Sequence, residues 1–590
     1  MKRILASLVA VPALLGTACG FAPKAPPEEH LTKGDYSPVV DYLEKYIPTR
    51  MRKHGFTGLS VALVDDQEVV WSEGFGFADK SAGRRSTAST VYRAGSVSKL
   101  FTAMAALKLH EEGRVDLDAP ITDHVPEFDL RTRFGSIDGI TLRTLLTHHS
   151  GVPGAIHEGM WAEDPDSFRT VAARLGRYYA AYPPGTVFAY SNAGYSVAGH
   201  AIENASGTPF ADHLEEALLG PLEMTRSNFR FEAIGEDVAR SYWKGREVEQ
   251  PGLRDLPAGG LVTTVGDLAG LIRLVNADGF YGTRLLTPET VREMLAVQEY
   301  DSVYEPEGFN GIGWFSFPGF LDGKYTAVGH TGQTLAHSAA VFVVPELELG
   351  VALLANSPSL RGGLEEITRE VLRVSHAVAT GRTLASVPVP DRPATALPGT
   401  RTGFAGLYAS RFGALEITET GTGYDVAVEG TTMKLSGDDE GGHAVSARLF
   451  GFIPLTPPGM GGLSFFAREV SGEKLIFVVG PGGRVELVAT EVEAQERRAA
   501  WDAALGTYRL SDPVPSDGPF FRIDDVTLAY ERGLYQLTIE TSLEPRRLVL
   551  DVIDDAEATL QGYGRDLGET VFLEPDGSLR HAEWRFERTP

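Results

Sequence analysis

A proline-rich stretch late in the chain most constrains how this sequence can fold, because it divides 590 residues into two differently patterned parts. Between Ser386 and Thr400 several prolines fall close together, as is typical of a linker between domains. Before it, helical and strand patterns intermix, and after it short apolar runs are broken by Gly, Asp and Pro. A chain of this length exceeds one hydrophobic core. We therefore predict a multidomain protein with an α/β-type layered domain at 39–380, a linker at 381–400 and a mostly β part at 401–590.

Local patterns in the first domain specify several of its elements. Leu59 to Val64 and Glu68 to Trp71 flank a polar turn and predict a hairpin. Leu100 to Glu112 has apolar residues at helical spacing and is followed by Gly113, so we expect a helix that ends at this glycine. Two apolar runs, Ala339 to Val344 and Gly350 to Ala355, predict a second hairpin in the core.

The C-terminal half is predicted to hold two related β modules. Phe404 to Tyr408 and Ala504 to Tyr508 each open a segment of similar length and character, which indicates an internal repeat. The charged, alanine-rich stretch from Glu491 to Ala504 predicts a short connecting helix. The predicted modules are 401–490 and 491–590. The linker before them suggests that they and the first domain fold separately, so we expect the first domain to remain active without residues 401 to 590.

The N-terminus predicts export. A basic start and an apolar run from Ile4 to Leu15 are typical of a signal peptide, here placed at 1–18. Cys19 follows as the only cysteine, and its position resembles the lipid-modified first residue of a bacterial lipoprotein. Ordinary secretion with an incidental cysteine is the alternative. We expect an exported protein whose only membrane contact is a lipid anchor at Cys19, with 19–38 as the tether, since no other run has the length of a membrane span.

Charge and composition exclude several functions. The formal net charge is -25, and no basic cluster offsets it, so nucleic acid is excluded as a partner. A single cysteine cannot build a zinc site, and the 14 histidines include no His-Glu-x-x-His pair. We therefore expect neither a metal nor another cofactor.

Three short motifs carry the candidate chemistry: Ser96-Val97-Ser98-Lys99, Tyr190-Ser191-Asn192 and His330-Thr331-Gly332. Each is weak alone, since Ser241 and Ser471 also begin Ser-x-x-Lys sequences and His149 begins a second His-x-Gly. The sequence that follows each motif distinguishes the candidates. Only the first Ser-x-x-Lys opens a predicted helix.

Ser96 and Lys99 are predicted to act as a pair. Residues three apart on a helix are neighbours, so the lysine amine can reach the serine hydroxyl. A serine hydroxyl is a poor nucleophile until a base takes its proton, and lysine serves when burial or a nearby cation lowers its pKa. The N-H groups at the start of a helix favour the oxyanion that forms when Ser96 attacks a carbonyl.

The other two motifs are predicted to surround the substrate. Tyr190 follows a Pro-Pro-Gly turn and can relay a proton, while the Asn192 amide can donate to a substrate carbonyl. Gly332 lets a substrate backbone lie against a strand edge, where His330 and Thr331 can bind a carboxylate or carbonyl. An unperturbed histidine titrates near ~6.5, so we expect carboxylate binding to weaken between about pH 6 and 8.

In this order and spacing, the motifs resemble those of serine β-lactamases and low-molecular-weight penicillin-binding proteins. Tyr190-Ser191-Asn192 resembles the class C form, but His330 stands where class C enzymes have lysine. Histidine there resembles D-Ala-D-Ala carboxypeptidases, D-aminopeptidases and related esterases. The resemblance covers about Val39 to Val374. It implies an antiparallel sheet flanked by helices, a helical subdomain and then two small barrel-like modules, as in D-aminopeptidase-like members.

The resemblance also implies a role for each residue. Ser96 is the nucleophile, Lys99 the activating amine, Tyr190 the proton-transfer partner and Asn192 a substrate-side donor, and the N-H groups of Ser96 and Gln333 form the oxyanion hole. The implied function is a serine hydrolase that forms an acyl-enzyme on small D-amino-acid peptides or esters, with peptidoglycan among the candidate partners. A class C-type β-lactamase is the nearest alternative. A non-catalytic penicillin-binding receptor or binding lipoprotein is the alternative from another class.

Overall fold

In the computed structural model, residues 31–589 are described except for short gaps. The gaps are 158, 231–237, 301, 303–308, 322, 360–361, 383–396, 411, 429–430, 438–441, 450–452, 456–461, 481–484, 512–522, 542–544 and 582–583. The predicted signal peptide, Cys19, the first part of the tether and most of the proline-rich linker lie outside the described residues. Within them, no helix combines the length and apolarity needed to cross a membrane.

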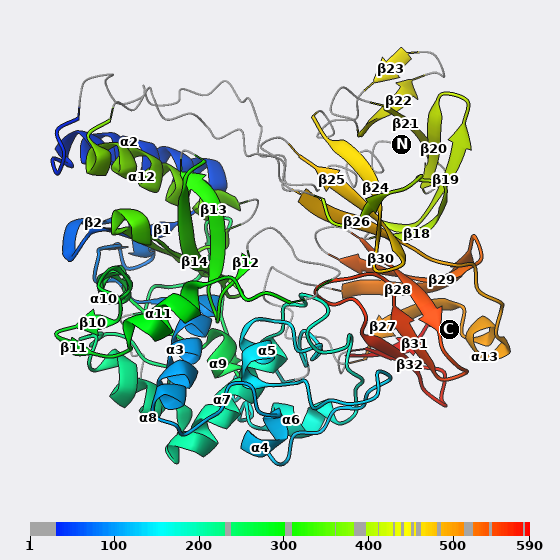
Figure 1. Ribbon diagram of the computed structural model, residues 1–590, viewed down its shortest axis with the longest axis horizontal. Coiled ribbons are helices and arrows are strands. Elements are labelled where there is room, and N and C mark those ends of the chain that lie inside the picture. Colours follow the sequence, from blue (N-terminus) through cyan, green and yellow to red (C-terminus); the bar gives the residue numbers. More distant parts are fainter. Residues whose placement is uncertain are drawn as a thin grey trace.

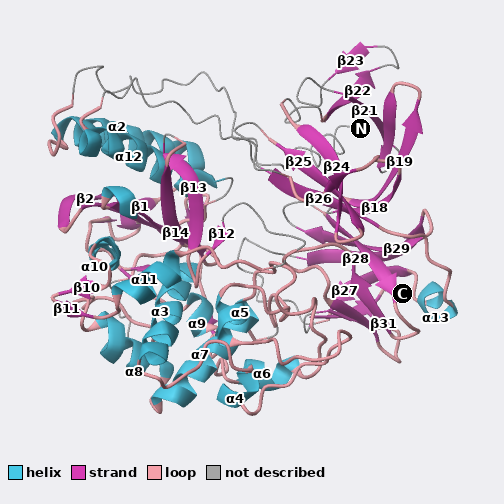
Figure 2. Cartoon of the chain, in the orientation of Figure 1, coloured by secondary structure: helices cyan, strands magenta, loops and turns pink. Residues whose placement is uncertain are grey.

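The first domain is built on an antiparallel sheet of eight strands (Figures 1 and 2). The predicted hairpins are confirmed as β1 (Gly58–Asp65) with β2 (Glu68–Asp79), and β15 (Ser338–Val344) with β16 (Leu349–Ala355). The strand order is β12-β13-β14-β15-β16-β1-β2-β3, so the two hairpins meet where β1 pairs with β16. The remaining strands are β3 (Arg84–Arg85), β12 (Phe309–Asn310), β13 (Phe315–Leu321) and β14 (Tyr325–Gln333).

Helices cover both faces of this sheet, because alternate residues of the central strands point to opposite sides. Val61 and Leu63 of β1 pack in the core formed with α2 (Ser37–His54) and α12 (Gly363–Thr380). Ala62 and Val64 enter the larger core on the other face. That core includes the remaining long helices, α3 (Ser98–Glu111), α7 (Asn192–Ser206) and α10 (Val265–Asn276). The predicted α/β-type fold is thus confirmed.

Shorter elements complete the helical side of the domain. Its helices are α4 (Ile121–His124), α5 (Leu142–Leu146), α6 (Thr170–Leu175), α8 (Phe210–Leu214), α9 (Leu256–Gly259) and α11 (Pro288–Leu295). Its two-residue strands are β4 (Tyr92–Arg93), β5 (Trp161–Ala162), β6 (Tyr242–Trp243), β7 (Arg246–Glu247), β8 (Gly252–Leu253), β9 (Val262–Thr263), β10 (Phe280–Tyr281) and β11 (Thr283–Arg284).

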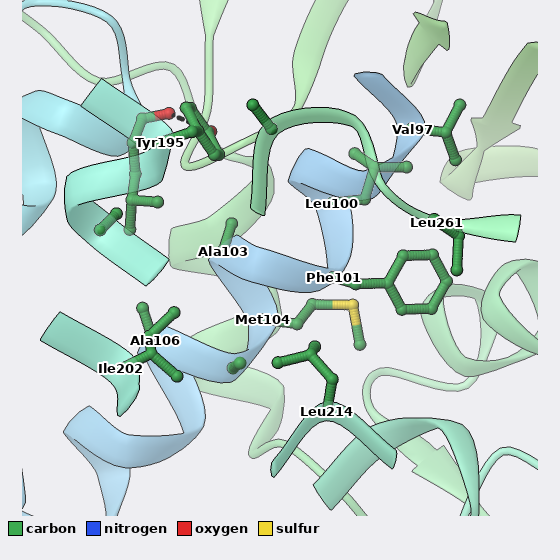
Figure 3. Packing of buried hydrophobic residues seen from close by; sticks show 14 of the residues in the cluster. Val97, Leu100, Phe101, Ala103, Met104, Ala106, Tyr195, Ile202, Leu214 and Leu261 are labelled. Atoms are coloured by element: carbon green, nitrogen blue, oxygen red, sulfur yellow. Dashed lines mark hydrogen bonds between the residues drawn. The ribbon is translucent and has the colours of Figure 1, made fainter. Parts of the chain in front are cut away.

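Helix α3 differs slightly from its prediction at both ends. Ser96 lies in a 3-10 turn, Gly95–Val97, and the α-helix begins two residues later. The helix ends at Glu111, and Gly113 follows in the left-handed conformation at φ +68°. Leu100, Phe101 and Met104 are fully buried, and Figure 3 shows Met104 near Leu214 of α8 and Ala106 beside Ile202 of α7. This packing fixes the helix that carries Lys99.

The C-terminal half forms two β modules of closed topology. In the first, a pairing between β22 and β24 closes a ring of eight strands, and β17 and β23 extend it. Its strands are β17 (Thr400–Arg401), β18 (Gly406–Ser410), β19 (Gly413–Thr420), β20 (Gly423–Val428), β21 (Thr431–Gly437), β22 (His443–Leu449), β23 (Ile453–Leu455), β24 (Ser464–Val470), β25 (Glu473–Val479) and β26 (Val485–Glu491). The second is a closed barrel of β27 (Gly506–Leu510), β28 (Ile523–Glu531), β29 (Leu534–Thr541), β30 (Arg546–Val552), β31 (Glu557–Leu560), β32 (Thr570–Leu573), β33 (Leu579–His581) and β34 (Trp584–Arg588).

Both repeat segments open their modules in the same way. Tyr408 donates from its hydroxyl to the Phe404 carbonyl at 2.7 Å, and Tyr508 makes the corresponding bond to Ala504. Both tyrosines are fully buried and stand two residues into the first strand of their eight-strand rings. The short repeated sequence therefore encodes a buried tyrosine that ties the strand to the segment before it.

The predicted connecting helix is much shorter than expected. Only Ala499–Ala503 is helical, as α13, rather than the whole stretch from Glu491 to Ala504. The preceding residues bond to the second barrel instead. The Gln495 N-H donates to the Gly533 carbonyl at 2.7 Å, and the Arg498 N-H donates to the Tyr535 hydroxyl at 2.9 Å. Tertiary partners thus outweigh the helical propensity of this stretch.

The second barrel packs directly on the first domain, beside α5 and α6 (Figure 1). Phe572 of β32 joins the core of that domain, and its ring lies 6.2 Å from the Tyr178 ring. Glu557 of β31 pairs with Arg131 at 3.1 Å and Arg133 at 2.8 Å. The first domain and the second barrel are therefore joined by a partly apolar interface as well as by the chain between them.

Candidate active site

The 3-10 turn places Ser96 beside the end of β14, beyond Gly329, where the pairing of β14 with β13 has stopped. The turn is held by Ser98, whose hydroxyl donates to the Gly95 carbonyl at 2.6 Å and accepts from the Leu261 N-H at 2.9 Å. Gly332 lies so close that a Cβ there would stand 1.9 Å from the Ala94 carbonyl oxygen. This contact explains the glycine in the third motif, because no side chain fits between strand and turn.

Lys99 lies one helical turn after Ser96, and its amine is close to the Ser96 hydroxyl. Its Nζ is 3.4 Å from the Ser96 Oγ, and it donates to the Asn192 Oδ1 and the Ala258 carbonyl, each at 2.8 Å. A neutral amine has two hydrogens and one lone pair. Because two acceptors take the hydrogens, the lone pair is left for the hydroxyl of Ser96.

The pKa of Lys99 is held well below its usual value. Burial is the main cause, since the side chain is fully buried, and the charge of Arg565 adds to it. Asp255 opposes the shift, but its own pKa is raised by burial and it is paired with Arg254 at 2.7 Å. The neutral amine required of a general base is therefore favoured.

Tyr190 and Asn192 lie on either side of the helix cap that begins α7. Ser191 provides the cap, as its Oγ accepts from the Gly194 N-H at 2.8 Å. Tyr190 donates from its hydroxyl to the Ser96 Oγ at 2.8 Å. Burial raises the pKa of Tyr190 to about 12, although the bond to Ser96 and the charge of Arg565 act in the other direction. The phenol is therefore neutral at physiological pH and suited to passing on a proton rather than to acting as the resting base.

The third motif lies on β14, where His330, Thr331, Gly332 and Gln333 pair with β15. Burial and the charge of Lys99 lower the pKa of His330 to about 3. Its Nδ1-H donates to the Thr331 carbonyl, and its buried Nε2 has no hydrogen-bond partner among the described residues. The expected titration of His330 between pH 6 and 8 is therefore wrong, because the ring is a buried neutral group. It can offer an acceptor but no charge.

The backbone nitrogens of Ser96 and Gln333, which are expected in the oxyanion hole, lie at the contact between the 3-10 turn and β14. A Cβ on Gly95 would lie 2.7 Å from the Gln333 N, and one on Gly332 would lie 3.1 Å from the Ser96 N. The strand and the turn thus bring Lys99, Tyr190, Asn192, His330, Gly332 and Gln333 close to Ser96, and Thr331 lies on the same strand.

The two other Ser-x-x-Lys sequences, which begin at Ser241 and Ser471, lie in different surroundings. Ser241 is buried beside His337, whose Nδ1 accepts from the Arg93 N-H at 3.0 Å. The Nε2 of that ring must then carry hydrogen and donate to Ser241, so it cannot act as a base. Ser471 sits in the turn between β24 and β25 with φ +52°, and its Lys474 pairs with Glu491.

The second barrel brings residues to the site that no sequence motif indicates. The loop 561–569 between β31 and β32 reaches the first domain, and the Arg565 guanidinium carbon lies 5.1 Å from the centre of the Tyr190 ring. Glu569 accepts from the Gly154 N-H at 2.7 Å. Three glycines, at 562, 564 and 568, mark a loop here, but no motif connects it to a serine more than 400 positions earlier.

These groups can carry out acyl transfer. Lys99 can take the Ser96 proton as the Oγ attacks a carbonyl, and Tyr190 can pass a proton to the leaving group. The backbone nitrogens of Ser96 and Gln333, which lie at the contact between turn and strand, can supply the donors that a developing oxyanion needs. Among the described residues, no group of three His, Cys, Asp or Glu side chains is placed to hold a metal ion.

A helix-flanked antiparallel sheet with a Ser-Lys-Tyr cluster beside one of its strands defines the class of serine β-lactamases and penicillin-binding proteins. The Beta-lactamase family matches residues 43–374, and the chain belongs to this family. Its members are generally serine hydrolases.

Several proteins are similar to this chain over more than half of its length. Protein flp of Staphylococcus aureus (strain N315) is 26% identical over 324 residues, which cover 53% of this chain and 62% of that protein. Unguisins hydrolase ungD of Aspergillus violaceofuscus is 24% identical, over 68% of this chain and 83% of that protein. The octameric penicillin-binding protein homologue from Pyrococcus abyssi has a TM-score of 0.51 at 26% identity, covering 77% of this chain and 100% of that one. SurE solved with D-Leu is similar in fold, with a TM-score of 0.52 at 24% identity, over 77% and 99%.

Proposed function

We propose that this protein is a serine hydrolase that forms an acyl-enzyme at Ser96, with D-amino-acid peptides or esters as its substrates. One observation carries the proposal: the Ser96 hydroxyl lies between the buried Lys99 amine at 3.4 Å and the Tyr190 hydroxyl at 2.8 Å. Ser96 is also partly exposed, so a substrate can reach it. Attack by Ser96 releases an amine or alcohol, and water then frees the acid and regenerates the serine.

Charge around the site supports a substrate with a carboxylate. His330 is neutral, whereas Arg565 is half exposed beside Tyr190 and provides a cation. A guanidinium is the side chain best suited to carboxylate recognition. Two similar proteins support the proposal: SurE was solved with D-Leu, which supports a D-amino-acid substrate, and ungD is named a hydrolase of unguisins, which supports hydrolysis.

The test begins with covalent labelling. The protein is treated with a fluorophosphonate probe and fluorescent penicillin, and its turnover of a neutral ester, a D-amino-acid peptide and nitrocefin is measured. We expect Ser96→Ala to remove labelling and turnover, because only Ser96 has Lys99 and Tyr190 beside it. Ser241→Ala and Ser471→Ala are the matched controls and should retain both.

The outcomes separate the candidate activities. Mass spectrometry should place the label on the peptide containing Ser96, and persistent labelling of Ser96→Ala protein would contradict the assignment. Fast nitrocefin turnover with slow peptide turnover would favour the β-lactamase alternative. Labelling without any turnover would instead indicate a penicillin-binding receptor.

A further inference from the structure

The loop 561–569 of the second barrel is fitted closely against the first domain. Tyr182 donates from its hydroxyl to the carbonyls of Gly562 at 3.0 Å and Gly564 at 3.3 Å. Gly568 has no room for a side chain, since a Cβ there would stand 2.7 Å from the Tyr182 ring. These contacts fix both ends of the loop and therefore the position of Glu569, which follows directly.

Hydrogen bonds connect Glu569 to the catalytic lysine in three steps. The Gly154 N-H donates to the Glu569 Oε1 at 2.7 Å, and the Gly154 carbonyl accepts from the Asn192 N-H, also at 2.7 Å. The Asn192 Oδ1 then accepts from the Lys99 Nζ at 2.8 Å. A single residue, Gly154, separates the barrel from the start of α7, so a shift of Gly154 moves Asn192 directly.

The surroundings of Glu569 favour an uncharged acceptor. The side chain is 5% exposed, and burial together with the nearby Asp566 raises its pKa to about 8. The hydrogen bond from the Gly154 N-H, and then Arg565 and Arg546, act against this shift, and the His581 Nε2 lies 3.9 Å from the Glu569 Oε2. His157 faces the same cluster through Asp566, and burial lowers its pKa to about 4. A protonated carboxyl keeps one oxygen free to accept from Gly154.

We propose that Glu569 is a positioning residue of the active site, which holds Gly154 so that Asn192 and Lys99 keep their arrangement around Ser96. The inference rests on the proposed function, and it assigns to the second barrel a part in catalysis. Glu569 acts through Gly154 and touches neither the substrate nor the reacting atoms.

The test compares three variants of the full-length protein. Glu569→Ala removes the acceptor, while Glu569→Gln keeps an oxygen that can accept from Gly154 and cannot ionise. Glu557→Gln is the matched control, because it weakens the ion pairs to Arg131 and Arg133 in the same interface without contacting Gly154. Each is assayed for kcat and KM with a neutral ester at pH 7 and for the rate of fluorophosphonate labelling, and its folding is checked by thermal unfolding.

The expected result is selective. Glu569→Ala should lower kcat about ten- to hundredfold with KM changed by less than about threefold, since displaced catalytic groups affect the chemical step most. Glu569→Gln should restore kcat to within about threefold of the original protein, and Glu557→Gln should retain it. Equal losses in Glu569→Ala and Glu557→Gln, or no rescue by Gln, would overturn the inference. If the unmodified protein itself is not labelled at Ser96, the proposed function fails first, which distinguishes the two failures.

Discussion

At the scale of single residues, the site depends on two groups whose neutral forms are favoured by burial. Burial and then Arg565 lower the pKa of Lys99, and burial raises the pKa of Tyr190 to about 12. The same buried environment therefore favours a neutral base and a neutral proton carrier. The pKa values of the two groups shift in opposite directions because burial disfavours the charged form of each, the ammonium of lysine and the phenolate of tyrosine.

Removal of either group should slow acylation strongly. We expect Lys99→Ala and Tyr190→Phe each to reduce the rate of Ser96 acylation on the order of a hundredfold or more, the usual size of a general acid-base contribution. Lys108→Ala is the matched control, because this lysine lies on the same helix and contacts the Leu285 carbonyl and Glu112 instead. Near-full activity in either site variant would remove that residue from the mechanism. Stopped-flow ester hydrolysis measures the rate.

The pH dependence distinguishes His330 from Arg565 as the group that recognises a carboxylate. The pKa of His330 is lowered to about 3, so its charge is already absent at pH 5 and does not change up to pH 9. The ratio of kcat/KM for a carboxylate-bearing substrate to that for a neutral ester should stay level over this range. Arg565→Gln should lower the ratio about tenfold at every pH. A ratio that falls near pH 6.5 would show that His330 is charged in the working enzyme.

Local sequence patterns predict the residues of the site much better than their protonation. Ser96 and Lys99 were identifiable because their spacing and the following helix are local properties. The pKa of His330 was not predictable, since it depends on burial, with the Phe315 ring of β13 4.8 Å away, and on a lysine from another element. Arg565 and Glu569 approach the site only after the barrel docks.

At the scale of elements, β14 and the 3-10 turn act as one unit. The sequence predicted a helix beginning at Ser96, but the α-helix begins at Ser98, and the tighter turn lets Gly95 adopt φ +53° against Gln333. The hairpins were predictable because a short turn pairs neighbouring strands. The length of the connecting helix was not predictable, because Gln495 and Arg498 form hydrogen bonds with residues of the second barrel that lie far along the chain.

Separation of strand and turn should inactivate the protein. In Gly332→Ala, the new Cβ would stand 1.9 Å from the Ala94 carbonyl, so β14 must move away from Ser96. We expect acylation to fall at least a hundredfold, because the oxyanion donors lose their positions. Gly266→Ala is the control, since its Cβ meets nothing closer than 3.6 Å at the start of α10. Equal activity of the two variants in the labelling assay would refute the role of this contact.

At the scale of the whole molecule, the sequence predicted the parts and their order but not their docking. Two barrels follow from strand patterns and from the repeated tyrosine segment. The interface between the second barrel and the first domain does not follow from the sequence, because its residues Phe572, Glu557 and Tyr182 are scattered along the chain and belong to no motif. Phe572 nevertheless lies in the core of the first domain, 7% exposed, which conflicts with fully separate folding units.

Deletion of residues 401 to 590 should therefore affect both the stability and the activity of the first domain. It removes Phe572 from the apolar contact with Tyr178, leaves Arg131 and Arg133 without Glu557, and takes away the acceptor of the Gly154 N-H. Since the first domain keeps its own sheet and both of its helical layers, we expect the truncated protein to fold with a lower melting temperature. Its labelling at Ser96 should be at least tenfold slower, because Asn192 loses the support that reaches it through Gly154. Comparison with Glu569→Ala separates the causes: a truncated protein as slow as that variant indicates that Glu569 carries the effect, whereas full activity would show that the first domain is self-sufficient.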